Sequence, residues 1–232
     1  MSRKIKILIV IVVLIIIGVI IISGIINKSK KIIVCIDAGH GGIDVGANDE
    51  NRYEKNDTLK VAKLVRKYLE KEDIKVIMTR TDDKTCTLQE RCKIANKKKA
   101  SLFVSLHRNS ADTGNGIEIW INSKRSKKDI NLATNIMKYI EKTKIQNDRG
   151  IKYGTIKGEN TDYYVFNNTK MPSCLIELGF ISDEEDNKLF DENIKKANAN
   201  SNVLKVCDPA FWLDTVECEL PSGFSENNTL GI

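Results

Sequence analysis

The sequence has few histidines and no regular cysteine spacing. Only two histidines, His40 and His107, occur among 232 residues, so a site built on imidazole groups can draw on those two alone. Six cysteines are present, but no C-x-x-C pair occurs, and the cysteines therefore form no metal-binding pattern. Cys86 and Cys92 are close in sequence, but spacing alone does not support a disulfide between them.

Acidic residues are absent from the first 31 positions, which hold six lysines and arginines. The remaining 31 basic residues are matched by 31 acidic residues, so the net charge of +6 belongs to the N-terminal segment. A nucleic-acid-binding domain should carry a basic excess on its folded part. Nucleic acid is therefore not an expected partner.

One long apolar run lies near the N-terminus, at residues 7–26. About 20 apolar residues can cross the ~30 Å hydrocarbon core of a bilayer as a helix. No convincing signal-peptide cleavage site follows, so we expect residues 1–28 to form an uncleaved membrane anchor. Basic residues flank the run on both sides, and the positive-inside rule alone does not orient it.

Residues 29–199 alternate between strand and helix patterns, which predicts a single α/β domain with helices on both faces of a sheet. Residues 200–232 lack sustained helical periodicity and are expected to form an irregular tail. Glycine-bearing residues 146–160 are expected to form a loop. Strands are expected at residues 32–36, 74–79, 101–109, 115–121, 162–166 and 173–177, and helices from Asp57, from Thr87 to about residue 98, and at 126–142 and 183–199.

Both histidines stand where a buried strand is expected to end. The run from Lys31 to Gly42, KIIVCIDAGHGG, is apolar and then breaks into glycines around His40. The run from Ser101 to Asn109, SLFVSLHRN, has the same form around His107. Ligands in open α/β sheets bind beyond the carboxyl ends of strands, so the two imidazoles are expected at one site.

Two imidazoles at strand ends favour a borderline-soft divalent metal, with zinc as the first choice. A catalytic zinc site needs a third protein ligand, and no further histidine exists. Glu54 follows the His40 loop at the expected start of a helix and is one candidate. On spacing alone, Asp44, Asp49 and Glu50 remain alternatives, and an exposed glutamate without a metal role also fits.

Glu177 closes another apolar strand, in the run MPSCLIELGF at residues 171–180. A carboxylate placed there is costly unless it meets a cation, a metal or a hydrogen-bond network. Beside a metal it could serve as a general base, taking a proton from water and returning it to a leaving nitrogen. A glutamate that merely caps a turn is the alternative.

Taken together, these runs resemble the zinc-dependent N-acetylmuramoyl-L-alanine amidases of the amidase-3 family. The resemblance implies that His40, Glu54 and His107 are zinc ligands, that Glu177 is the catalytic glutamate, and that the fold is a twisted mixed sheet of about six strands between helices. It implies cleavage of the amide that joins the lactyl group of N-acetylmuramic acid to L-alanine in peptidoglycan. The matching runs are DAGHGG at 37–42, Glu54-Lys55, SLHRN at 105–109, GIEIW at 116–120, RGIK at 149–152 and MPSCLIELGF at 171–180.

Asn109 and Arg108 are candidate substrate-binding residues because they directly follow His107. Arg108 stands where the family commonly has a small residue, which would alter the shape or charge of the groove. The short form, an anchor followed by one catalytic domain, resembles the CwlD-type amidases of spore-formers, whose cleavage prepares muramic-δ-lactam in the spore cortex. That resemblance implies a domain on the cell-wall side of the membrane, and a protein activator remains an open expectation.

Three other functions remain open at this stage. A vegetative cell-separation amidase would carry the same motifs. A membrane-tethered glycan-binding domain without turnover would need no intact site, although all four expected site residues are present. A zinc peptidase would cut a bond within the stem peptide instead.

Overall fold

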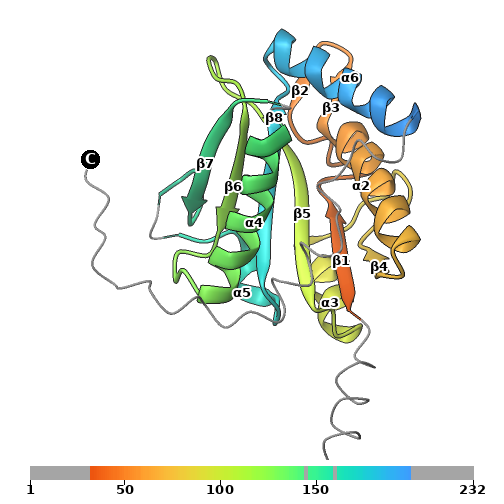
Figure 1. The fold of residues 1–232 in the computed structure, drawn as a ribbon, viewed down its shortest axis with the longest axis vertical. Helices are drawn as coiled ribbons and strands as arrows, with labels where there is room; N and C mark the ends of the chain where they lie inside the picture. The colour runs from red at the N-terminus through yellow and green to blue at the C-terminus, as the bar shows by residue number, and fades with distance from the viewer. Residues whose placement is uncertain (1–31, 144–145, 159–160, 200–232) are drawn as a thin grey trace, which may run out of the picture. The chain divides into compact units, whose positions relative to one another are not determined.

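The computed structural model describes residues 32–143, 146–158 and 161–199, which form one α/β domain around a six-stranded mixed sheet (Figure 1). The strands lie in the order β4-β1-β5-β8-β6-β7, and a two-stranded ribbon, β2-β3, stands apart from them. The elements are β1 (Ile33–Ala38), β2 (Asn48–Asp49), β3 (Arg52–Tyr53), α2 (Glu54–Lys71), β4 (Lys75–Met78), α3 (Leu88–Lys97), β5 (Leu102–Asn109), β6 (Ile117–Ile121), α4 (Lys127–Thr143), β7 (Asp148–Tyr153), α5 (Tyr164–Asn168), β8 (Ser173–Phe180) and α6 (Glu184–Ala199).

The strand directions bring the carboxyl ends of four strands, β4, β1, β5 and β8, to one edge of the sheet. β1 is parallel to β4 and β5, and β5 is parallel to β8. β6 runs antiparallel to β8, and β7 is parallel to β6. The loop after β1 and the last residues of β5 therefore lie side by side, as the positions of His40 and His107 in the sequence predict.

Helices cover both faces of the sheet. Side chains alternate between the faces along each strand, and the central strands are apolar on both, so both faces have to be buried. Cys35, Phe103 and Leu175, on three neighbouring strands, pack with Ala95 of α3 and Val165 of α5 in one apolar cluster. On the other face α2 contacts β1, β4 and β5, while α4 contacts β6, β7 and β8 (Figure 1). α6 packs against α2 and β8 there.

Several local predictions are confirmed. Thr87 and Glu90 form a reciprocal capping box at the start of α3, in which the Thr87 hydroxyl accepts from the Glu90 N–H at 3.2 Å. The strands around residues 33–38, 102–109 and 173–180 and the helices at 127–143 and 184–199 are present, and four described cysteines, Cys35, Cys86, Cys92 and Cys174, are buried and unpaired.

Three local predictions are wrong. α2 begins at Glu54 rather than after Asp57, because Asp57 is bonded to arginines and caps nothing. Residues 146–160 are not all loop, because residues 148–153 form the edge strand β7. Residues 162–166 are not a strand: residues 164–168 form the short helix α5, and the neighbours Val165 and Phe166 are both buried in the cluster with α3.

The predicted membrane anchor at residues 1–28 and the predicted tail at 200–232 lie outside the described residues. Within the described part, none of the helices is long and apolar enough to cross a membrane.

Arg108, which the sequence offers as a substrate-binding candidate, is among the residues that line the site pocket, but its side chain is directed away from His107. Residues 107 and 108 are consecutive in β5, so their side chains point to opposite faces of the sheet. The Arg108 guanidinium is fully buried beneath α2 and α6, where Nη1 donates to Asp57 Oδ2 at 2.7 Å and Nη2 donates to Asn187 Oδ1 at 2.8 Å. Nη2 also donates to the Phe180 carbonyl at 3.1 Å, and Arg108 therefore joins β5, α2, α6 and the end of β8.

We expect Arg108→Ala to lower the free energy of unfolding by about 3 kcal/mol, because it leaves the Asp57 carboxylate buried with one arginine fewer. Arg66→Ala is the matched control, since Arg66 pairs with Glu70 on the exposed face of α2 and its loss should cost less than about 0.5 kcal/mol. Urea unfolding of both variants measures the difference. Equal, small losses would contradict the structural role of Arg108.

Candidate active site

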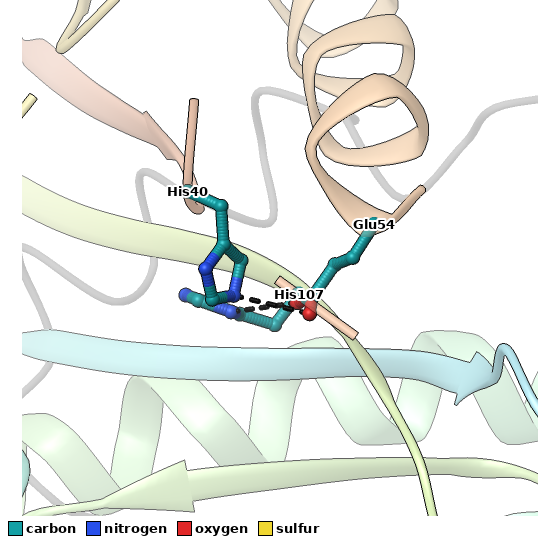
Figure 2. A group of neighbouring side chains, drawn as sticks. All are labelled: His40, Glu54 and His107. Carbon is teal, nitrogen blue, oxygen red and sulfur yellow. Dashed lines mark hydrogen bonds and ion pairs between the residues drawn. The ribbon is translucent and has the colours of Figure 1, made fainter. Parts of the chain in front are cut away.

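Three of the predicted site residues meet at one point. His40 follows β1, Glu54 is the first residue of α2, and His107 lies near the end of β5 (Figure 2). Each offers one ligand atom, and these atoms all lie within 4.8 Å of one another. Among the described residues this is the only group of three or more histidine, cysteine, aspartate or glutamate side chains placed to share a metal ion.

The backbone at His40 is held in an unusual conformation. His40 has φ of 58°, in the left-handed region that non-glycine residues rarely adopt. Two buried arginines support this turn: Arg91 Nη2 donates to the His40 carbonyl at 2.7 Å, and Arg80 Nη2 donates to the Gly39 carbonyl at 2.8 Å. Arg91 is itself paired with the buried Asp37 at 2.6 Å. These hydrogen bonds therefore hold the His40 backbone, and with it the direction of the His40 Cα–Cβ bond, in place.

The Glu54 carboxylate is the centre of the group. Its Oε1 accepts from the Arg108 N–H at 2.9 Å and lies 2.9 Å from His107 Nδ1. Its Oε2 accepts from the Ala47 N–H at 2.8 Å and lies 3.0 Å from His40 Nε2. Burial alone would raise the pKa of Glu54, but the hydrogen bonds and charges of the two imidazoles outweigh it and hold that pKa far below its ordinary value. Glu54 is therefore ionised.

Two glycines leave room for these side chains. A Cβ on Gly39 would lie 2.5 Å from His107 Cε1, and a Cβ on Gly46 would lie 2.6 Å from Glu54 Oε2. Both distances are shorter than real Cβ contacts, so a larger residue at either position would displace a site side chain. Gly39 and Gly46, in the loop after β1, thus leave space for His107 and Glu54 in addition to allowing the chain to turn.

The donor set fits a divalent metal such as zinc. Two imidazole nitrogens and a carboxylate oxygen are three ligands of a common catalytic zinc arrangement, in which ligand atoms about 2.0–2.2 Å from the ion lie about 3.3 Å apart. The three donor atoms lie within 4.8 Å of one another, and His40 Nε2 is 3.0 Å from Glu54 Oε2, so small side-chain movements would gather them around one ion. His40 Nδ1 lies 2.9 Å from Asp44 Oδ2, a bond that leaves Nε2 as the metal-facing nitrogen. Asp44 is thus placed to orient a ligand.

Glu177 lies beside this group on the same face of the sheet. It is directly opposite His107 across the β5–β8 pair and directly opposite Glu118 across the β6–β8 pair. Its Oε2 is buried and has no hydrogen-bond partner. Burial, and then the negative charges of Glu54 and Glu118, raise the pKa of Glu177 well above its ordinary value, while the more weakly acting charge of Arg108 lowers it. Such a carboxyl group is prepared to exchange a proton.

These residues open into a single pocket of about 510 Å³. His40, Glu54, His107 and Glu177 all line it, and so does Asn109. Asn109 stays a prediction as a substrate-binding residue, because the pocket places it near the site without showing what it binds. A separate cavity of about 570 Å³ is lined largely by acidic residues near the start of α6 and contains none of the predicted site residues.

Sequence reasoning missed Glu118. This buried carboxylate accepts from Asn109 Nδ2 at 2.8 Å, from Trp120 Nε1 at 3.0 Å and from Arg149 Nε at 2.9 Å. It thereby orients Asn109 at the edge of the pocket. The signal was present, because an acidic residue inside the apolar run GIEIW raises the same question as Glu177 does in its own strand.

Comparison with known proteins identifies relatives of this chain and solved structures with the same fold. The chain is 36% identical over 173 residues to the uncharacterized protein YqiI of Bacillus subtilis (strain 168), a match that covers 73% of this chain and 81% of YqiI. The catalytic domain of CwlV, an N-acetylmuramoyl-L-alanine amidase from Bacillus (Paenibacillus) polymyxa, superposes with a TM-score of 0.67 at 32% identity and covers 79% of this chain and 99% of that domain. The CwlD amidase from Clostridioides difficile, solved in complex with the GerS lipoprotein, gives a TM-score of 0.66 at 26% identity over 78% of this chain and 98% of CwlD.

The family model for N-acetylmuramoyl-L-alanine amidase matches residues 34–206, a range that contains all four predicted site residues. Together with the fold and the pocket, this match establishes that the chain belongs to the amidase-3 family of N-acetylmuramoyl-L-alanine amidases.

Proposed function

We propose that the chain is a zinc-dependent amidase that cleaves the bond between the lactyl group of N-acetylmuramic acid and L-alanine in peptidoglycan. One observation carries the proposal: the unpartnered buried oxygen of Glu177 lies next to a His-Glu-His donor set in one pocket. His40, Glu54 and His107 would hold the ion. When bound, zinc polarises the scissile carbonyl as a Lewis acid and makes water more acidic.

Glu177 supplies the proton transfers. Its free oxygen accepts a proton from the attacking water, and the same carboxyl group then gives that proton to the departing alanine nitrogen.

The cellular setting is also part of this proposal. The apolar run at residues 7–26 anchors the chain in the membrane, with the catalytic domain on the cell-wall side. The likeness to CwlD supports a role in spore-cortex muramic-δ-lactam formation, and the complex of CwlD with the GerS lipoprotein supports a protein partner for this chain. A vegetative cell-separation role is the alternative.

The direct test is digestion of muropeptides by the purified chain with zinc, analysed by mass spectrometry. New L-alanine amino termini together with glycans that carry free lactyl carboxylates are expected. Intact muropeptides despite bound zinc would indicate a glycan-binding domain without turnover. Cleavage within the stem peptide would indicate a peptidase.

Glu177→Gln should keep zinc bound and lower kcat by about 10²–10⁴-fold, because an amide has the shape of the carboxylate but cannot accept the proton. Zinc content by atomic absorption and turnover of a muramoyl peptide are measured on the same sample. Asp112→Asn, a change outside the pocket-lining residues, serves as the control. Turnover of Glu177→Gln near the wild-type rate would remove Glu177 as the base.

Gly39→Ala should sharply weaken zinc binding, because the new methyl group would overlap the His107 ring. His40→Ala and His107→Ala should also weaken it sharply, because each removes a proposed ligand. Gly150→Ala is the matched control: no atom lies within 4 Å of the added Cβ, so this variant bears only the strain of its positive φ and should bind zinc normally. Zinc affinity is measured by competition with a chromogenic chelator. Equal affinities for the two glycine variants would contradict the assigned geometry.

A further inference from the structure

Exposed apolar side chains gather at the mouth of the active-site pocket. Among the described residues, four large hydrophobic side chains are strongly exposed: Ile43 at 90%, Ile156 at 68%, Leu88 at 51% and Tyr164 at 37%. Ile43, Leu88 and Tyr164 all line the pocket that contains Glu177, whereas Ile156 does not. We call these three residues the apolar rim. Grouped exposed apolar residues, unlike scattered ones, mark a binding surface.

The Ile43 side chain is exposed on a fixed turn. Gly41 and Asp44, on either side of it, exchange two backbone hydrogen bonds of 2.8 and 3.2 Å. The Ile43 N–H donates to Thr85 Oγ1 at 3.2 Å, which ties the turn to the neighbouring loop. The turn thus holds a large aliphatic group in water at a set position. A ligand that covers this group gains hydrophobic free energy without having to order the turn.

The other two rim residues, Leu88 and Tyr164, are also on backbone that is held in place, each at the start of a helix. Leu88 is the first residue of α3 and lies within the Thr87–Glu90 capping box, directly after the N-cap Thr87. Tyr164 is the first residue of α5, whose next residue, Val165, is buried in the core cluster beside α3. Both side chains therefore start from backbone that packing and capping hold in place.

The rim provides almost no charge. The other exposed residues that line the pocket carry hydroxyl groups, apart from Asp44, whose carboxylate is bonded to His40 Nδ1. No lysine or arginine is among the exposed lining residues, so the stem-peptide carboxylates meet no partner there. These other exposed lining residues are Asp44, Thr85, Thr87 and Ser110.

We propose that the apolar rim binds the uncharged, methyl-bearing part of the substrate: the lactyl and L-alanyl groups on either side of the scissile amide. This inference rests on the proposed function, because that amide must reach Glu177 and its two substituents then extend from Glu177 toward the rim residues that line the same pocket. Both substituents carry a methyl group, the kind of surface that Ile43 and Leu88 can remove from water. Tyr164 offers a ring face that can cover the same groups.

The test uses Ile43→Ser and Leu88→Ser in the whole chain, with Ile156→Ser as the control because Ile156 is also a strongly exposed isoleucine but lies outside the pocket lining. The probes are a soluble muramoyl peptide that begins with L-alanine and its analogue that begins with glycine. Each rim variant should raise KM for the L-alanine peptide about 3–10-fold, with kcat within about twofold and unchanged zinc content. Ile156→Ser should match the wild type.

The glycine analogue adds a second readout. The wild type should prefer the L-alanine peptide over the glycine peptide by about 3–10-fold in kcat/KM, and this preference should shrink in Ile43→Ser or Leu88→Ser. Wild-type KM values in both rim variants would overturn the role of the rim while leaving the amidase function in place. A similar KM increase in Ile156→Ser would also overturn it. Absence of cleavage by the wild type would instead defeat the proposed function itself.

Discussion

The site depends on the Glu54 carboxylate. It is 3% exposed, at the point where α2 meets the end of β5 and the loop after β1. A buried carboxylate is stable only when hydrogen bonds or cations surround it. Two backbone N–H groups and two imidazoles meet that need here, and a divalent cation between the same side chains would meet it more fully. The arginine-supported His40 turn and the space left by Gly39 keep those imidazoles within reach.

The sheet sets the distance between the metal ligands and the base. His107, Glu177 and Glu118 are directly opposite one another on three neighbouring strands, and they share one face. Neighbouring strands lie about 4.8 Å apart, so the side chains of His107 and Glu177 begin from backbone positions at about this separation on the same face. The same alternation sends Arg108 to the opposite face, where it links the elements that carry Glu54, His107 and Glu177. The candidate catalytic side chains thus lie on one face of these strands, and the arginine that links the supporting elements lies on the other.

Sequence reasoning succeeded where the signal was local and failed where packing decided. The apolar runs before His40 and Glu177 and the Thr87–Glu90 box predicted their elements correctly. The edge strand β7 was missed because Gly150, in a left-handed conformation, interrupts its alternation, and its pairing with β6 includes a register shift. α5 was read as a strand because Val165 and Phe166 are apolar, although both contact the cluster with α3, which no local pattern reveals. The sequence alone left Glu54 as one of several acids, and only the fold and the family resemblance separate it from them.

The central claim is that His40, Glu54 and His107 hold one zinc ion beside Glu177. Anomalous diffraction at the zinc absorption edge, from crystals grown with zinc, measures this directly. We expect a single strong peak about 2.0–2.2 Å from one atom of each of the three ligands, in the pocket that Glu177 also lines. A peak that lies elsewhere, or one that contacts fewer than three of these side chains, would contradict it.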